Sequence, residues 1–340
     1  MDEGNTYPKF KTLRHKLSKT TLNAIKNMGF KHMTAVQAEV LPKALDGCDV
    51  VATAKTGSGK TLAFLIPVVE SICKQLMDSH IHGTLCIVIS PTRELALQTY
   101  TVLQDLLSHH STITSSLVIG GENRNKQSVE LSTGVHIVVA TPGRLFDHMR
   151  TKEFDYSHVN YLVLDEADKI FQYGFEEDLK QIIGRLPKNR QTMLFSATEA
   201  ETTHTLIKSA MKDDVQSINM SEDNLRATVE GLKQGYAICE TEQRLYWLHK
   251  LLKKTANFKV MVFFSSCKSV IFHHEFFSKY CQASVLCIHG KMNQADRTST
   301  ITNFYNAEKV ALFCTDLAAR GLDIPAVDWI VQFDPPADTN

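Results

Sequence analysis

Short apolar runs alternate with longer stretches of helical periodicity along almost the whole chain. In the short runs, apolar residues follow one another without alternation, as in strands that a parallel sheet buries on both faces. In longer stretches such as 93–108 and 242–254, apolar residues recur at the spacing of one helix face. The pattern predicts an α/β fold with strands at 49–53, 85–90, 117–119, 135–140, 161–164 and 192–195, then at 235–239, 259–264, 284–288, 310–314 and 328–332.

The two series of strands predict two domains, which suits a chain of 340 residues. A polar stretch that includes Lys212, Asp214 and residues 221–224 separates them. We therefore predict a first domain at 1–212, a linker at 213–229 and a second domain at 230–340.

Composition limits the class of protein but does not identify a ligand. Apolar residues make up 43% and charged residues 22%, a normal balance for a globular protein. No apolar run is long enough to span a membrane and residues 1–10 lack a signal core, so we expect a nuclear or cytoplasmic protein. Lys plus Arg and Asp plus Glu number 37 each, which neither supports nor excludes nucleic-acid binding. The 8 cysteines form no CxxC pair, which favours buried thiols over a zinc site.

A phosphate-binding loop is predicted directly after the first strand. The sequence AKTGSGKT passes from strand to helix, and its glycines let backbone amides surround phosphate oxygens. Lys60 would supply a charge to the β- and γ-phosphates, and Thr61 would offer its hydroxyl to Mg²⁺. The general pattern has glycine where this chain has Ala54, so a glycine-rich turn without a ligand is the alternative. The residues expected around the phosphates are Thr56, Gly57, Ser58, Gly59, Lys60 and Thr61.

A pair of carboxylates follows the predicted strand 161–164. Asp165 stands where a strand would deliver it to hold hydrated Mg²⁺, and Glu166 can orient or deprotonate an attacking water. The alternative is an acidic, solvated helix start, which is common for a single Asp-Glu pair. Other polar residues also follow strands, namely Lys60, Thr92, Arg93 and Ser196, and ligands bind outside the carboxyl ends of such sheets.

These residues together resemble the DEAD-box RNA helicases, whose name is spelled by Asp165-Glu166-Ala167-Asp168. Further segments match that family in order: Phe10, Gly29-Phe30 and Gln37; 91–96; Gly120-Gly121; 141–144; Ser196-Ala197-Thr198; 262–264; His289-Gly290-Lys291; Gln294 and Arg297; and 315–323. The resemblance implies two RecA-like domains with mainly parallel sheets, the second incomplete at its C-terminus. It also implies RNA-stimulated hydrolysis of ATP with Mg²⁺, with ATP and RNA bound across a cleft whose closure bends the RNA strand.

The resemblance assigns roles residue by residue. Phe10 and Gln37 would read adenine, Gly321 and Asp323 would reach the nucleotide, and Asp168, Ser196 and Thr198 would couple hydrolysis to strand separation. The residues expected at RNA are Pro91, Thr92, Arg93, Gly120, Gly121, Thr141, Arg144, His289, Gly290 and Thr315. Arginines, threonine hydroxyls and glycine backbones suit phosphate and ribose, so binding should tolerate any sequence. Singly, each would be ordinary surface structure.

Three tracts, 231–236, 259–267 and 324–332, resemble the nucleolar subfamily that acts on pre-ribosomal RNA. That resemblance implies a monomer working on pre-ribosomal particles in the nucleolus. The family's arginine-rich motif is expected after the ending 333–340, and without its arginine finger the chain should turn over ATP slowly. The alternatives are a DNA-directed translocase and a nucleotide-dependent RNA clamp or scaffold with little turnover.

Overall fold

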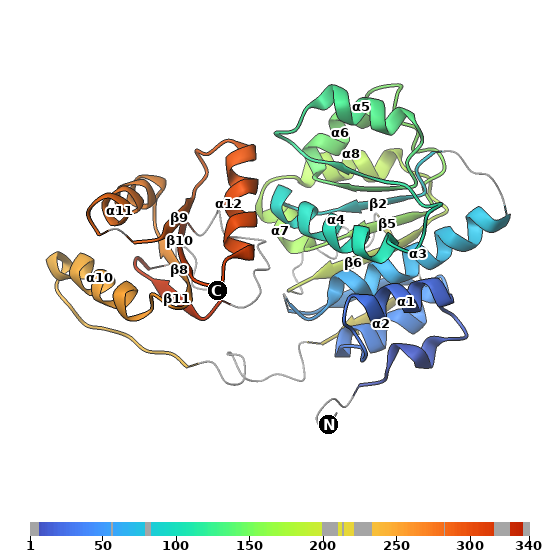
Figure 1. The fold of residues 1–340 in the computed structure, drawn as a ribbon. Coiled ribbons are helices and arrows are strands. Elements are labelled where there is room, and N and C mark those ends of the chain that lie inside the picture. The colour runs from blue at the N-terminus through green and yellow to red at the C-terminus, as the bar shows by residue number, and fades with distance from the viewer. Residues whose placement is uncertain are drawn as a thin grey trace. The chain divides into compact units, whose positions relative to one another are not determined.

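The computed structural model describes residues 7–55, 57–78, 83–198, 210–212, 214–220, 233–281, 283–315 and 327–335. Its contacts divide the chain into two compact units, Met1–Leu225 and Arg226–Asn340. Each unit is built on its own parallel sheet, of seven strands in the first and four in the second (Figure 1). The prediction of an α/β fold with parallel sheets is confirmed.

The sheet of the first unit has the strand order β3-β4-β2-β5-β6-β1-β7, and every pair is parallel. Most strands lie at the positions that the continuous apolar runs predicted. The strands are β1 (Asp49–Thr53), β2 (Cys86–Ile89), β3 (Ser115–Val118), β4 (Ile137–Ala140), β5 (Tyr161–Leu164), β6 (Gln191–Ser196) and β7 (Val215–Asn219).

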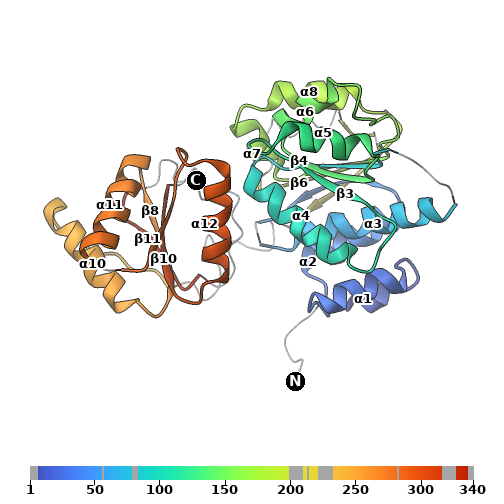
Figure 2. The same ribbon diagram turned by 45° about the horizontal axis from the view of Figure 1, so that its top comes forward.

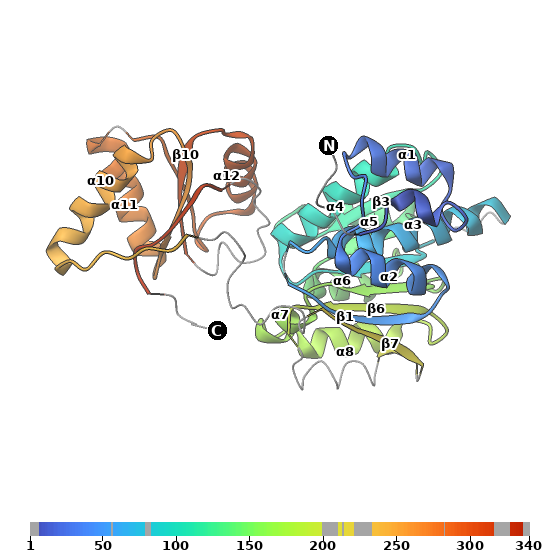
Figure 3. The same ribbon diagram turned by 90° about the horizontal axis from the view of Figure 1, so that it is seen from below.

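Helices cover both faces of this sheet, and alternate residues of each central strand enter two separate cores. In β2, Cys86 and Val88 join one core while Ile87 and Ile89 join the other. Helices α1 (Lys19–Asn27), α2 (Ala35–Leu45), α3 (Lys60–Asp78) and α4 (Arg93–Leu107) pack in the first core; α5 (Arg124–Ser132), α6 (Pro142–Met149), α7 (Ala167–Gln172) and α8 (Glu176–Arg185) pack in the second. Figures 2 and 3 show the two helix layers, and η1 (Phe10–Leu13) precedes α1.

The linker predicted at 213–229 is wrong at its start, because Val215–Asn219 forms strand β7 of the first sheet. β7 pairs with β1 in register Asp49 to Val215. Only Ile218 of this strand is buried, since β7 lies at the edge of the sheet. A short edge strand carries little of the apolar signal by which the other strands were predicted.

The second unit has the strand order β11-β8-β10-β9, again parallel throughout. Its strands are β8 (Lys259–Phe264), β9 (Val285–Ile288), β10 (Val310–Thr315) and β11 (Trp329–Gln332). Helices α10 (Arg244–Lys254) and α11 (Cys267–Tyr280) cover one face, and α12 (Gln294–Asn306) covers the other (Figure 2). The helical turn η2 (Thr241–Gln243) leads into α10.

The strand predicted at 235–239 is not present. Residues 233–240 have no regular secondary structure, and Tyr236 and Ile238 are 92% and 91% exposed. The segment is a continuous apolar run like those of the other strands, but a strand is stable only beside a neighbour, and none of the described strands pairs with it.

The cysteines are free thiols, and Cys86 and Cys314 are fully buried while the others are half-buried. In the described residues no group of His, Cys, Asp or Glu has the arrangement of a metal-binding cluster. No helix in that same part of the chain is long and apolar enough to cross a membrane.

Candidate nucleotide and RNA site

Apart from Phe10 and Gln37, which precede β1, the residues singled out in the first unit follow the carboxyl ends of parallel strands, so they meet at one edge of the sheet. The strand order divides this edge into two halves. The candidate nucleotide residues follow β5, β6 and β1, which are adjacent strands. The candidate RNA residues follow β3, β4 and β2, which form the other half.

The phosphate loop connects β1 to α3. Gly57 and Gly59 have φ values of 78° and 90°, a left-handed backbone that other residues rarely adopt. A side chain at Gly59 would also come within 2.7 Å of Nε2 of Gln37. Lys60 begins α3, and its Nζ donates to the carbonyl oxygen of Ala54 at 2.7 Å. Thr56 lies outside the described residues.

The structure brings Lys60 and the carboxylates of the Asp165–Asp168 segment together. Lys60, Asp165, Glu166 and Asp168 are each less than 8% exposed. Burial lowers the pKa of Lys60, and the charges of Asp165, Glu166 and Asp168 oppose that shift. These four groups therefore form one buried electrostatic cluster.

Asp165 is harder to ionise than an ordinary aspartate. Burial, followed by repulsion from Glu166, raises the pKa of Asp165 to about 7, and Lys60 partly opposes the rise. Its backbone N–H donates to the carbonyl of Ile89 at 2.9 Å, which holds the start of this segment against β2. A carboxylate in such a place is stabilised by any cation that binds beside it.

Glu166 is held in an unusual position. Its φ of 47° and ψ of 53° are left-handed, and no other described non-glycine residue has a positive φ. Nζ of Lys169 lies 2.7 Å from Oε2 of Glu166, so this carboxylate is already ion-paired. The sequence analysis did not identify Lys169, although a lysine three residues after Glu166 in a helix can reach the Glu166 carboxylate.

Ser196 and Thr198 are linked to the carboxylate segment and to the phosphate loop. The Ser196 hydroxyl donates to the carbonyl of Thr198 at 2.7 Å, and Oδ1 of Asp168 accepts from the backbone N–H of Ala197 at 3.3 Å. The backbone N–H of Ala54 donates to the carbonyl of Ser196 at 2.9 Å. The end of β6 thus contacts both halves of the nucleotide site.

Gln37 connects α2 to the phosphate loop. Its Oε1 accepts from the backbone N–H of Thr34 at 2.9 Å, which completes a capping box, and its Nε2 donates to the carbonyl of Gly59 at 3.0 Å. Phe10 is only 3% exposed and packs in the core, so its assignment to a base stays a prediction. Phe30, from the same predicted segment, is 47% exposed.

On the RNA half of the edge, Arg93 lies against Gly120. A Cβ placed on Gly120 would come within 2.9 Å of a terminal nitrogen of the Arg93 guanidinium, so a larger residue would displace that side chain. Gly121 has a left-handed φ of 88°. Thr92 follows Pro91 and caps α4, accepting from the backbone N–H of Leu95 at 3.2 Å.

Arg144 is positioned by Gln127, a residue that the sequence analysis missed. Nη1 of Arg144 donates to Oε1 of Gln127 at 2.9 Å and to the carbonyl of Glu122 at 3.1 Å. The same Oε1 lies 3.2 Å from Nε2 of His148, and Nε2 of Gln127 donates to the carbonyl of Ile119 at 3.1 Å. Gln127 is 4% exposed and joins the loop before Gly120 to α6, whose N-cap is Thr141.

In the second unit, His289 follows β9 and Thr315 ends β10, so both lie at the carboxyl edge of the second sheet. Each is 8% exposed, and Gly290 is exposed. Nδ1 of His289 accepts from the backbone N–H of Lys291 at 3.3 Å. Gly321 and Asp323 lie outside the described residues.

Comparison with known proteins places this geometry in a family. The sequence model described as DEAD/DEAH box helicase matches residues 34–206, and the model described as helicase conserved C-terminal domain matches 243–340. The chain belongs to the DEAD/DEAH box helicase family. The candidate nucleotide residues from Gln37 to Ser196 lie within the first match, and His289 and Thr315 lie within the second.

Two ATP-dependent RNA helicases have nearly the same sequence identity to this chain. The probable ATP-dependent RNA helicase pitchoune of Drosophila melanogaster is 52% identical over 97% of this chain and 48% of its own length. The ATP-dependent RNA helicase DDX18 of Homo sapiens is 51% identical over 97% of this chain and 49% of its own length. The chain spans about half the length of these curated relatives.

Solved helicase structures share the fold. Mss116p bound to ssRNA and AMP-PNP has a TM-score of 0.87 and 29% identity, covering 98% of this chain and 71% of that one. Dbp5 of S. cerevisiae bound to RNA and ADP BeF3 has a TM-score of 0.83 and 26% identity, covering 98% and 82%.

Proposed function

We propose that this chain is the catalytic part of an ATP-dependent RNA helicase that locally unwinds short RNA duplexes or remodels RNA–protein complexes. The observation that carries the proposal is the buried cluster of Lys60 with Asp165, Glu166 and Asp168, which lies on the same sheet edge as Arg93 and Arg144. The relatives named as ATP-dependent RNA helicases, and the related structures bound to RNA and nucleotide, support it.

ATP would bind with its triphosphate along the phosphate loop. Lys60 would leave the carbonyl of Ala54 to meet the phosphates, since that hydrogen bond occupies it in the structure. Gln37 donates a hydrogen bond to the carbonyl of Gly59, so a base that contacts Gln37 would directly affect the position of the phosphate loop.

Thr61 and Asp165 would hold Mg²⁺, largely through water. A hydroxyl and one carboxylate suit this ion, which prefers oxygen ligands and retains several waters beside nucleotide phosphates. Magnesium, when bound, neutralises the charge that develops on the phosphates. Asp165 fits this role because a nearby cation stabilises its ionised form.

Glu166 would orient the attacking water and accept its proton. Lys169 now occupies Oε2, so that ion pair must open or the other carboxylate oxygen must serve. Asp168, through the backbone of Ala197, would transmit the state of the nucleotide to Ser196 and Thr198.

RNA would be held by its phosphates and riboses. Arg93 and Arg144 offer charge-assisted hydrogen bonds, and Gly120 permits close approach of the backbone. Such contacts carry no base identity, so binding would tolerate any sequence. The resemblance to the nucleolar subfamily extends the proposal to a monomer that acts on pre-ribosomal particles during ribosomal RNA maturation in the nucleolus.

The proposal is tested with two variants of the phosphate site. Lys60→Ala should abolish ATP binding, because Lys60 is the buried lysine of the loop, whereas Lys55 is exposed. Glu166→Gln should retain ATP binding and lose hydrolysis by ~10²–10⁴-fold. Isothermal titration and phosphate release measure the two properties, and Lys26→Ala, an exposed change on α1, serves as control.

Comparing RNA with DNA as stimulant separates the alternatives. Stimulation by RNA alone supports the helicase, and equal stimulation by DNA would indicate a translocase. Nucleotide-dependent RNA binding without measurable turnover in the unmodified chain would instead identify an RNA clamp. Normal hydrolysis by Glu166→Gln would remove that residue from the mechanism.

A further inference from the structure

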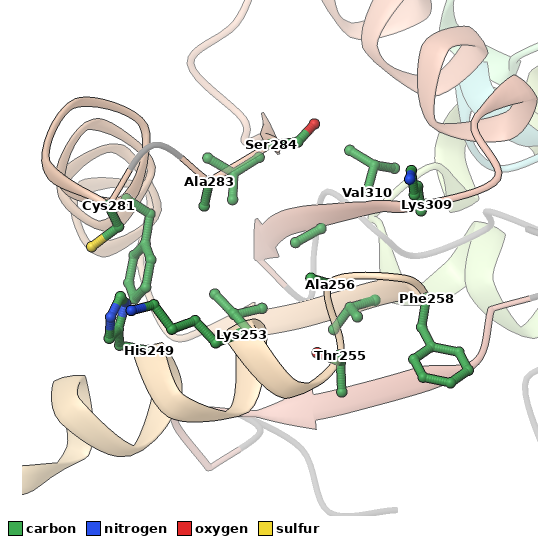
Figure 4. A pocket seen from close by; sticks show the side chains of 15 residues that line it. His249, Lys253, Thr255, Ala256, Phe258, Cys281, Ala283, Ser284, Lys309 and Val310 are labelled. Carbon is green, nitrogen blue, oxygen red and sulfur yellow. The ribbon is translucent and has the colours of Figure 1, made fainter.

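A pocket of about 340 Å³ lies in the second unit, at the amino edge of its sheet (Figure 4). It is lined by Val260, Val285 and Val310, at the beginnings of β8, β9 and β10. His289 and Thr315 follow or end the same strands at the opposite edge. The pocket, which we call the amino-edge pocket, is therefore distinct from the candidate RNA contacts of this unit.

The interior of the amino-edge pocket is apolar and its rim is basic. Leu252 of α10 and Phe277 of α11 are buried in its walls, whereas Lys253 and Lys309 are exposed among its lining residues. None of the residues lining it is an aspartate or glutamate. Within the described part of the chain, neither ammonium has a carboxylate partner, so both are available to an acidic ligand.

Exposed aromatic side chains extend this apolar surface beyond the pocket. Phe258 lines the pocket and is 44% exposed. On α11, exposed Phe272, half-buried Phe276 and exposed Tyr280 form an aromatic row with ring centroids 6.2 and 5.6 Å apart, and the Phe276 ring lies 5.6 Å from that of the lining residue Phe277. Contiguous exposed apolar surface of this kind marks protein interaction sites, and a small molecule confined to the pocket would leave the row uncovered.

We propose that the amino-edge pocket is a docking site for a short acidic peptide segment of a partner protein. One large apolar side chain of the segment enters the pocket, and its carboxylates meet Lys253 and Lys309. Adjoining residues of the segment cover the aromatic row. A single buried anchor surrounded by weaker contacts is the usual distribution of energy in such interfaces, and this proposal does not depend on the activity at the other edge.

The test is selection of random short peptides displayed on phage against the whole chain, with counter-selection on the Ala256→Trp variant. Ala256 lines the pocket and is exposed, so a tryptophan there should occupy the pocket without entering the core. Enriched peptides should carry one aromatic or large aliphatic residue flanked by aspartate or glutamate. As synthetic peptides they should bind the unmodified chain about tenfold or more tightly than the variant, which is roughly 1.4 kcal/mol.

A second pair of variants tests the charges independently of the pocket's shape. Lys253→Glu combined with Lys309→Glu should weaken the same peptides by about tenfold or more, with a larger effect at low salt. Lys268→Glu, exposed on α11 and outside the pocket, should leave the affinity unchanged. Circular dichroism melting confirms that each variant is folded.

The proposal is overturned if no peptide distinguishes the unmodified chain from Ala256→Trp, or if the enriched peptides lack acidic residues. Selection of basic peptides would assign a different partner. Self-association of the chain that Ala256→Trp abolishes, without peptide binding, would assign the pocket to a second copy.

Discussion

At the scale of single residues, Asp165 links the stability of the first unit to pH. Burial and Glu166 raise the pKa of Asp165 to about 7, above its ordinary value of roughly 4. The folded chain therefore binds this proton more tightly than the unfolded chain does. It follows that the contribution of Asp165 to stability falls as pH rises from about 4 to about 7, and is constant above that range.

Asp165→Asn should remove this dependence. We expect the variant to match the unmodified chain in free energy of unfolding near pH 4.5 and to exceed it by about 1–3 kcal/mol at pH 8, because the amide carries no buried charge. Urea unfolding across this pH range measures the difference. A variant that is less stable at pH 8 than at pH 4.5, relative to the unmodified chain, would contradict the assignment.

Gln127 should act on RNA through Arg144. Gln127→Leu leaves Arg144 without its side-chain acceptor and the Ile119 carbonyl without its donor, so RNA affinity should fall by roughly 3–30-fold while ATP binding is retained. Fluorescence anisotropy with single-stranded RNA measures the loss. The Val129→Ala change, exposed on the same helix, is the control. An unchanged RNA affinity would mean that Arg144 does not need this contact.

The grouping of Lys60 with Asp165 and Glu166 was predictable from the sequence, because recognisable motifs contain these residues and the structure brings them into one buried cluster. Gln127 and Lys169 were not, because each acts on a motif residue rather than on a ligand, and an isolated glutamine or lysine in a helix has no distinguishing pattern. Their roles depend on which side chains the fold brings within 3 Å.

At the scale of elements, Asp49 joins three strands of the first sheet at their amino ends. It is 2% exposed, with Oδ1 accepting from the backbone N–H of Thr192 at 2.8 Å and Oδ2 from that of Lys212 at 2.9 Å. The carboxylate thereby ties β1 to β6 and to the chain that enters β7.

Asp49→Ala should destabilise the first unit by about 1–3 kcal/mol, since one buried and one partly buried backbone donor lose their acceptor. The β7 amides should become less protected than those of β5 in hydrogen exchange. Asp46→Ala, a change at an exposed ion pair just before β1, should cost much less. Equal protection of β7 and β5 in the Asp49→Ala variant would show that edge pairing alone holds β7.

Strands could be predicted from the sequence where both of their faces are buried. Continuous apolar runs identified β2 and β8 because both faces of those strands are covered, which a sequence records directly. The exposed edge strand β7 was missed, and 235–239 was assigned to a strand from its apolar run alone. Whether such a segment pairs depends on a neighbouring strand, which its own sequence does not encode.

At the scale of the whole molecule, each unit has its own cores, so the units should respond separately to core mutations. Phe313 is fully buried in the second unit, where its ring lies 5.3 Å from that of Phe264 and 5.6 Å from that of Phe277. Phe313→Ala should destabilise the second unit by about 3–5 kcal/mol. Hydrogen exchange of β8 and β10 should rise while that of β1 and β5 stays unchanged. A parallel loss of protection in both units would show that they unfold together.

The division of the first sheet's carboxyl edge has a consequence for how such a protein can diversify. The loops after β3 and β4 hang from strands that are separated from β6 and β1 by β2 and β5. Exchanging those two loops between relatives should alter the preference for the bound nucleic acid, while the candidate nucleotide half keeps its geometry. Because of this strand order, the two halves of the edge can vary separately, and β2 and β5 form the boundary between them.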